Sequence, residues 1–214
     1  MIKILLFLIL MIANQFSAQT YNFDYKVHVL ERNIKNNEKI TEEDLHISSA
    51  DYKIKLMSQD NAKFAYFINY KNFNTYRFST STDVFGNKIL KYKDSLILPT
   101  EIKESNITRI KVAELSKYKL LVKIFSEENS KKSYLYLTIE IEPFEVNYLN
   151  LLTMVRPKNE RELINENIQN EITKLYGNQN FILKSCLSDN KNGQKSQTIF
   201  SDPKKESLEV KLPE

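Results

Sequence analysis

Short runs in which apolar and polar residues alternate recur along most of this chain, and they limit its fold more than any other feature. In the first run, every second residue from 21 to 29 is a tyrosine, phenylalanine or valine, and the residues between them are polar. A period of two with aromatic and β-branched residues on one side is typical of a half-buried β-strand. Similar runs predict strands at residues 52–57, 64–70, 75–81, 89–97, 109–115, 118–125, 134–141, 181–187, 195–200 and 208–212.

The segments between these runs contain turn-forming residues. Gly86-Asn87 and Asn192-Gly193 each separate two runs, and Asp202-Pro203 is expected to form a solvated turn. Such residues tolerate tight or left-handed backbone, so they favour β-hairpins. We therefore predict an antiparallel meander sheet that is curved into a half-barrel or packed as a sandwich.

Residues 158–176 depart from the two-residue period. Pro157 suits a first helical turn, Glu160 and Glu162 place negative charge near the positive end of the helix dipole, and Gly177 follows the segment. Apolar residues recur inside it at helical spacing, at positions 163 or 164, 168, 172 and 175. We predict one amphipathic helix here, within a mainly β (α+β) fold that forms a single domain over residues 19–214.

Residues 1–18 have the three parts of a secretory signal peptide. Lys3 supplies a positive head, residues 4–12 are apolar, and Ser17 and Ala18 are small residues suited to a cleavage site. We expect cleavage after Ala18 and export to the periplasm or the extracellular space. The single cysteine, Cys186, is far from this junction, so we expect no lipid anchor, and no later apolar run is long enough for a transmembrane segment.

Composition and spacing exclude several classes of function. The formal net charge is only +4 and the basic residues are mostly Lys scattered among acidic ones, so we expect no nucleic-acid partner. Three isolated glycines cannot build a phosphate-binding loop. We predict no catalytic residues, cofactor or metal site, because His28 and His46 could share a metal only if the fold brought them together. Cys186 is expected to be a small, partly buried apolar residue.

A dense aromatic patch is the strongest candidate for a binding site. Phe64, Tyr66, Ile68 and Tyr70 share one face of a predicted strand. Rings in this arrangement usually fill a core, and otherwise line a groove for an apolar, peptide or glycan ligand. We predict that these four residues form a concave, ligand-binding sheet face.

The layout of export signal, long antiparallel sheet and one late helix, with its Ser17-Ala18-Gln19 junction, resembles small exported β-rich proteins of unknown function from AT-rich Gram-negative bacteria. It is also similar at the level of fold to the half-barrels of periplasmic lipoprotein carriers, a likeness that implies a curved sheet sheltering acyl chains. Our leading hypothesis is a non-enzymatic binding protein of the cell envelope. The alternatives are a hydrolase that uses His28, His46 and a nearby acid, and a structural subunit of an envelope assembly.

Overall fold

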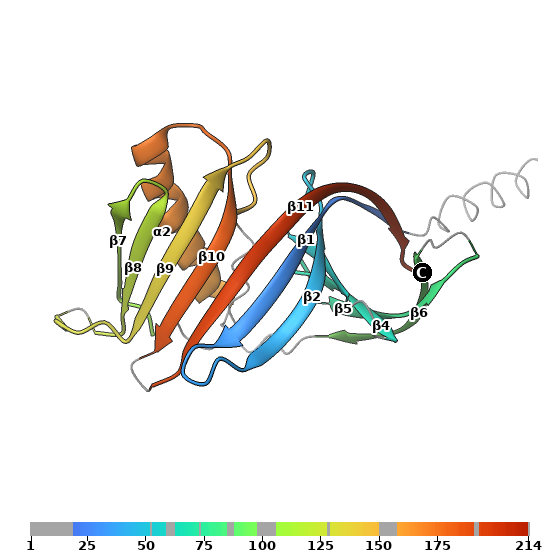
Figure 1. Ribbon diagram of the computed structural model, residues 1–214, viewed down its shortest axis with the longest axis horizontal. Coiled ribbons are helices and arrows are strands. Elements are labelled where there is room, and N and C mark those ends of the chain that lie inside the picture. Colours follow the sequence, from blue (N-terminus) through green and yellow to red (C-terminus); the bar gives the residue numbers. More distant parts are fainter. Residues whose placement is uncertain are drawn as a thin grey trace, which may run out of the picture.

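The computed structural model describes residues 19–51, 53–58, 63–72, 74–84, 88–97, 106–127, 129–149, 158–190 and 193–213, and the predicted signal peptide lies outside them. The described residues form one antiparallel sheet of eleven strands and one helix, which confirms the predicted mainly β fold (Figure 1). The strands are β1 (Thr20–Asn33), β2 (Lys39–Ile47), β3 (Ile54–Ser58), β4 (Phe64–Asn69), β5 (Asn74–Thr82), β6 (Lys88–Ile97), β7 (Arg109–Ser116), β8 (Lys119–Phe125), β9 (Leu135–Pro143), β10 (Phe181–Asn190) and β11 (Lys195–Lys211).

The order of the strands shows where the meander is interrupted. Neighbours in the sheet follow the order β6-β5-β4-β3-β2-β1-β11-β10-β9-β8-β7. Strands β1 to β6 and β7 to β10 are therefore two meanders, and β11 joins them by pairing with β1 on one side and β10 on the other. The helix α2 (Lys158–Tyr176) has the bounds that the sequence predicts. No helix among the described residues is long and apolar enough to cross a membrane.

Strand β11 is bent along its length, and the predicted turn at Asp202-Pro203 is wrong. The segment is part of one continuous strand, and Asp202 adopts a left-handed backbone with φ of 52°. The pairing of β1 with β11 shifts register twice, between Phe23 and Tyr25 and between Lys26 and His28. Such bulges bend a strand and increase its twist. Pro203 is tolerated because β10 pairs only with residues 195–199 of β11, so the rest of that edge needs no amide donor.

One half of the molecule has two layers, with α2 against the sheet formed by β7 to β10. Ile164, Ile168 and Ile172 recur every four residues on α2 and are buried. They join a core built from alternate residues of the strands, including Val27 of β1 and Leu137 of β9. The amphipathic pattern of the helix therefore produces the packing that it predicts.

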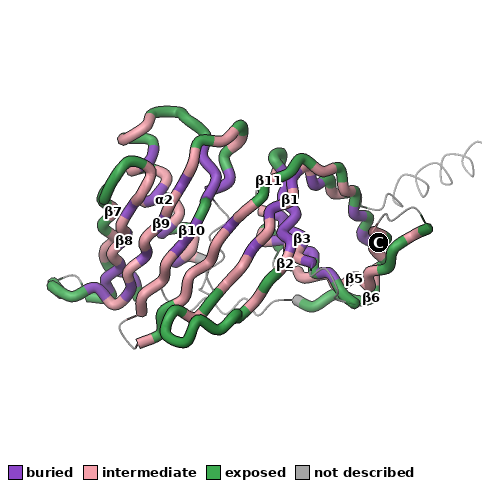
Figure 2. Tube along the Cα trace, viewed as in Figure 1, coloured by how far each residue is buried: buried purple, intermediate pink, exposed green. Residues whose placement is uncertain are grey.

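In the other half, the sheet curls around a second, smaller core. Strands β1 to β6 and the end of β11 surround this core, which includes the buried residues Phe23, Leu56, Phe67, Phe78 and Val210. Figure 2 shows the course of the curl, with buried segments in purple. β6 is the end strand of the sheet, so the described strands leave the curl unclosed between β6 and β11. This half is an open barrel whose two free edges face each other.

Candidate functional site

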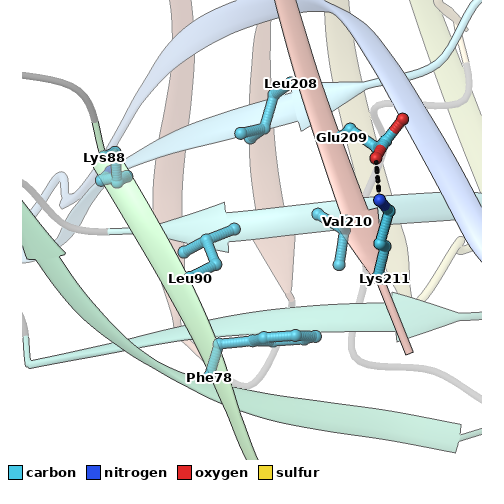
Figure 3. Close-up of a pocket in the computed structure, with 7 residues that line it drawn as sticks. All are labelled: Phe78, Lys88, Leu90, Leu208, Glu209, Val210 and Lys211. Atoms are coloured by element: carbon cyan, nitrogen blue, oxygen red, sulfur yellow. Dashed lines mark ion pairs between the residues drawn. The ribbon is translucent and has the colours of Figure 1, made fainter. Parts of the chain in front are cut away.

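The seam between β6 and β11 contains a pocket. It has a volume of about 210 Å³ and opens between two edges that share no backbone hydrogen bonds within the described sheet. The side chains that line it come from β5 and β6 on one side and from β11 on the other (Figure 3). These residues are Phe78, Lys88, Leu90, Leu208, Glu209, Val210 and Lys211.

The inner wall of the pocket is apolar. Phe78 and Val210 belong to the second core, and Leu90 and Leu208 are partly buried against it. On the outer side, Lys211 Nζ forms an ion pair with a Glu209 carboxylate oxygen at 3.0 Å (Figure 3). The third charged residue, Lys88, extends from the first position of β6. The pocket can therefore hold a small apolar group beside one ammonium group.

A chain of buried polar groups begins at Lys88. Lys88 Nζ donates to Ser58 Oγ at 2.9 Å, and Ser58 Oγ lies 3.1 Å from His46 Nε2. The other ring nitrogen of the histidine, Nδ1, is hydrogen-bonded to Glu206 of β11. His46 and Ser58 are only 1% and 2% exposed, so the chain runs through the interior from the pocket to the bend of β11.

The two ends of this chain fix the direction of its hydrogen bonds. An ammonium group can only donate and an ionised carboxylate can only accept. Lys88 therefore donates to Ser58 Oγ, and His46 Nδ1–H donates to Glu206. The hydrogen bond from His46 is the main cause that lowers the pKa of the Glu206 carboxyl below its ordinary value, and the charges of His46, Lys26 and Lys88 lower it further.

His28 and His46 lie on the same face of the β1–β2 pair but contact different carboxylates. His46 is opposite Lys26 and His28 is opposite Asp44 in the register of the two strands. His28 Nδ1 lies 3.4 Å from Asp44 Oδ1, and His28 Nε2 lies 3.3 Å from Glu42 Oε1. The other Asp44 oxygen, Oδ2, accepts a hydrogen bond from Lys26 Nζ at 2.7 Å. Within the described parts of the chain, no group of three His, Cys, Asp or Glu residues is placed to hold a metal ion.

The predicted aromatic row lies on the outside of the curl. Phe64 and Tyr66 are 36% and 42% exposed, Ile68 and Tyr70 are partly buried, and Phe67 between them points into the second core with no exposed surface. The predicted concave position of Phe64, Tyr66, Ile68 and Tyr70 is therefore wrong, because the alternation of β4 directs Ala65 and Phe67 inward. That the row binds a ligand stays a prediction.

Cations from three elements contact this row, and one of them, Lys55 of β3, has its Nζ 5.6 Å from the centre of the Tyr70 ring. The Arg77 guanidinium lies 5.1 Å from the centre of the Phe64 ring and is also paired with Asp94 of β6. Arg161, in the first turn of α2, lies 4.8 Å from the centre of the Tyr70 ring. These stacked guanidinium groups cover part of the aromatic surface and stabilise the exposed rings.

Two further ionisable side chains are buried and do not line the pocket. Burial lowers the pKa of Lys55 on β3 to about 7, with a contribution from the positive charge of Arg161. Burial raises the pKa of the Cys186 thiol to about 12. Because the thiolate is the nucleophilic form, Cys186 is unreactive at neutral pH.

Sequence reasoning singled out His46 but missed its partners Ser58, Lys88 and Glu206. These three residues come from β3, β6 and β11, which are separated by long stretches of sequence. The local signal was a polar residue at a position where the two-residue period places apolar side chains. Ser58 continues the series Ile54 and Leu56, and Glu206 begins the series that Leu208 and Val210 continue. A buried polar residue at such a position needs a partner from elsewhere.

No protein-family model matches this chain, and a search of curated proteins finds no significant match. Its class is therefore defined by its architecture and site. It is an open, curled antiparallel sheet with one helix, a small pocket at the unclosed seam and a buried polar chain that ends in that pocket.

Proposed function

We propose that this protein is an exported, non-enzymatic binding protein of the cell envelope that takes a small, largely apolar ligand in the seam pocket. The pocket between β6 and β11 is the observation that carries the proposal. The signal-like residues 1–18 support export.

The energetics of packing support a ligand at this position. An apolar group that covers the side chains of Phe78, Leu90 and Val210 removes their apolar surface from water, and this burial favours binding. Pairing of β6 with β11 would remove the pocket. The volume of about 210 Å³ is below the range that begins near 300 Å³ for pockets of drug-sized ligands, so the ligand or its buried part is small.

A second candidate function is an acyl hydrolase that uses Ser58, His46 and Glu206. The hydroxyl, imidazole and carboxylate are joined in the order that activates a serine nucleophile, with Ser58 Oγ 3.1 Å from His46 Nε2. A fluorophosphonate probe tests this candidate, because it labels activated serines. Labelling that is lost in Ser58→Ala and retained in Ser116→Ala, an exposed position on β7, would favour the hydrolase over the binding protein.

Calorimetric titration with octan-1-ol tests the binding proposal, using a matched pair of variants on β6. Leu90→Trp places a large side chain in the pocket, whereas Ile89→Trp places it at the neighbouring position, which is 47% exposed. We expect the unmodified protein and Ile89→Trp to bind the alcohol and Leu90→Trp to lose binding. Equal binding by both variants would contradict the proposed site, and no heat of binding to the unmodified protein would contradict the proposed function.

A further inference from the structure

We propose that the ligand of the seam pocket is a monocarboxylate with a short apolar tail, and that Lys88 binds its carboxylate. The inference rests on the proposed binding function and adds the chemical class of the ligand. The inference depends on three properties of Lys88: its fixed position, the N–H donors that make no hydrogen bond within the protein, and the charges of the groups around it.

Lys88 is held in place by the protein interior. Its ammonium group donates to Ser58 Oγ, and Ser58 is fixed in turn by His46. A surface lysine has several rotatable bonds and loses rotamer entropy when it binds a ligand. Because the buried chain already orients Lys88, an anion in the pocket meets a positioned charge.

The hydrogen-bonding capacity of Lys88 is incompletely used. An ammonium group has three N–H donors. Within the described residues, Lys88 makes one hydrogen bond, to Ser58 Oγ. The two remaining donors can bind the oxygen atoms of a carboxylate whose tail lies against Leu90 and Val210.

The charges around the pocket also favour an anion. Of the three charged residues in its lining, Lys211 and Glu209 neutralise each other in an ion pair, which leaves the positive charge of Lys88. The nearest carboxylate of the buried chain, Glu206, is hydrogen-bonded to His46. The charge of Lys88 also helps to lower the pKa of the Glu206 carboxyl. The two unused N–H donors of this one ammonium group suit a singly charged carboxylate, whereas a phosphate dianion would bring a second negative charge with no matching cation in the lining.

Titration with three eight-carbon probes that differ only in the head group tests this inference. The probes are octanoate, octan-1-ol and octylammonium, and the proteins are the unmodified chain, Lys88→Met and Lys91→Met. Lys91 is an exposed residue of the same strand and does not line the pocket. Thermal melting of each variant confirms that it is folded.

We expect octanoate to bind at least about tenfold more tightly than octan-1-ol, both to the unmodified protein and to Lys91→Met. A preference of this size is typical of one hydrogen bond to a charged group. Octylammonium should bind more weakly than the alcohol. In Lys88→Met the preference for octanoate should disappear while binding of octan-1-ol remains.

The possible failures separate the two proposals. Equal binding of octanoate and octan-1-ol by the unmodified protein would overturn the monocarboxylate inference and leave the apolar binding function standing. A preference for octanoate that persists in Lys88→Met would overturn the role of Lys88. Absence of binding for all three probes would overturn the proposed function and the inference together.

Discussion

Lys88 and Ser58 are joined by a hydrogen bond of 2.9 Å between the ammonium nitrogen and the hydroxyl oxygen, and this contact connects the pocket to the interior. Lys88 lines the pocket, whereas Ser58 is buried at the end of β3 and is hydrogen-bonded to His46. Any change in the buried chain therefore alters the orientation of the one cation that a ligand in the pocket would meet.

Ser58→Ala should destabilise the protein, because it removes the shared partner of Lys88 and His46. Leaving a buried polar group without a partner costs about 1–3 kcal/mol, so we expect a loss of that size in the free energy of unfolding. Urea denaturation measures it, with Ser116→Ala as the exposed control. A loss no larger than that of the control would show that the chain contributes nothing to stability.

Glu206 should make stability depend on pH in the acid range. The His46 hydrogen bond holds the pKa of Glu206 below its ordinary value, so the unfolded chain takes up the proton first as the pH falls. The stabilising contribution is therefore complete above the ordinary carboxyl pKa and is lost as the pH falls through the lower, folded value.

Glu206→Gln removes this titration, and denaturation at several pH values between 3 and 6 measures the effect. We expect the variant to be less stable at pH 6 and to differ less from the unmodified protein at pH 3. Glu209→Gln, which alters the ion pair with Lys211, is the control. A constant stability difference for Glu206→Gln across this range would contradict the linkage.

Lys55 should produce a rise in stability above neutral pH. The folded chain releases this proton near pH 7, whereas the unfolded chain holds it up to the ordinary value of 10.5. The unfolded state therefore binds more protons in this window, and stability rises by at most about 1.4 kcal/mol per pH unit.

Denaturation at pH 7 and pH 9 measures this rise. Lys55→Met, which has no ammonium group to desolvate, should lose most of it, and Lys91→Met should keep it. The same pH dependence in Lys55→Met and in the unmodified protein would show that Lys55 is not its source.

Tyr66 and Phe67 should respond in opposite ways to alanine. Phe67 has no exposed surface and contacts the rings of Tyr21, Phe23 and Tyr76, so Phe67→Ala should cost about 3–5 kcal/mol of stability. Tyr66→Ala on the outer face should change stability by less than about 0.5 kcal/mol. Denaturation of the two variants measures both effects.

The same Tyr66→Ala variant tests the outer aromatic row as a ligand-binding surface. If the row binds the ligand, Tyr66→Ala and Tyr70→Ala should weaken uptake while the fold remains. If the seam pocket binds it, as we propose, both variants should bind octan-1-ol as the unmodified protein does.

Sequence patterns predicted the elements that are governed by local periodicity. The alternation along β1 and the four-residue spacing on α2 each produce the face that packs, and both are readable from one segment alone. The strand β2 is not among the predicted strands, because three consecutive acidic residues, Glu42, Glu43 and Asp44, interrupt the alternation, although Asp44 is buried and paired with Lys26. Its pairing partner, which neutralises that charge, lies outside the local window.

The sequence predicted a curved sheet, but the place where it bends and the pocket that results were beyond prediction for a related reason. The bend of β11 depends on bulges at Asp202 and near Glu206, where composition indicates a turn. The pocket depends on the long-range approach of β6 to β11. The alternation in β4 correctly indicated that Phe64 and Tyr66 share one face. The direction of the curl decides whether that face is the inner or the outer one, and the sequence pattern placed it on the wrong side.

Mapping the ligand on the protein tests the central claim most directly. In a titration with octan-1-ol followed by methyl NMR, we predict that chemical-shift changes concentrate on Leu90, Leu208 and Val210, the methyl-bearing residues of the seam pocket. Changes centred instead on Ile68 beside the outer aromatic row, or no changes at saturating alcohol, would contradict a binding protein that uses the unclosed seam of its sheet.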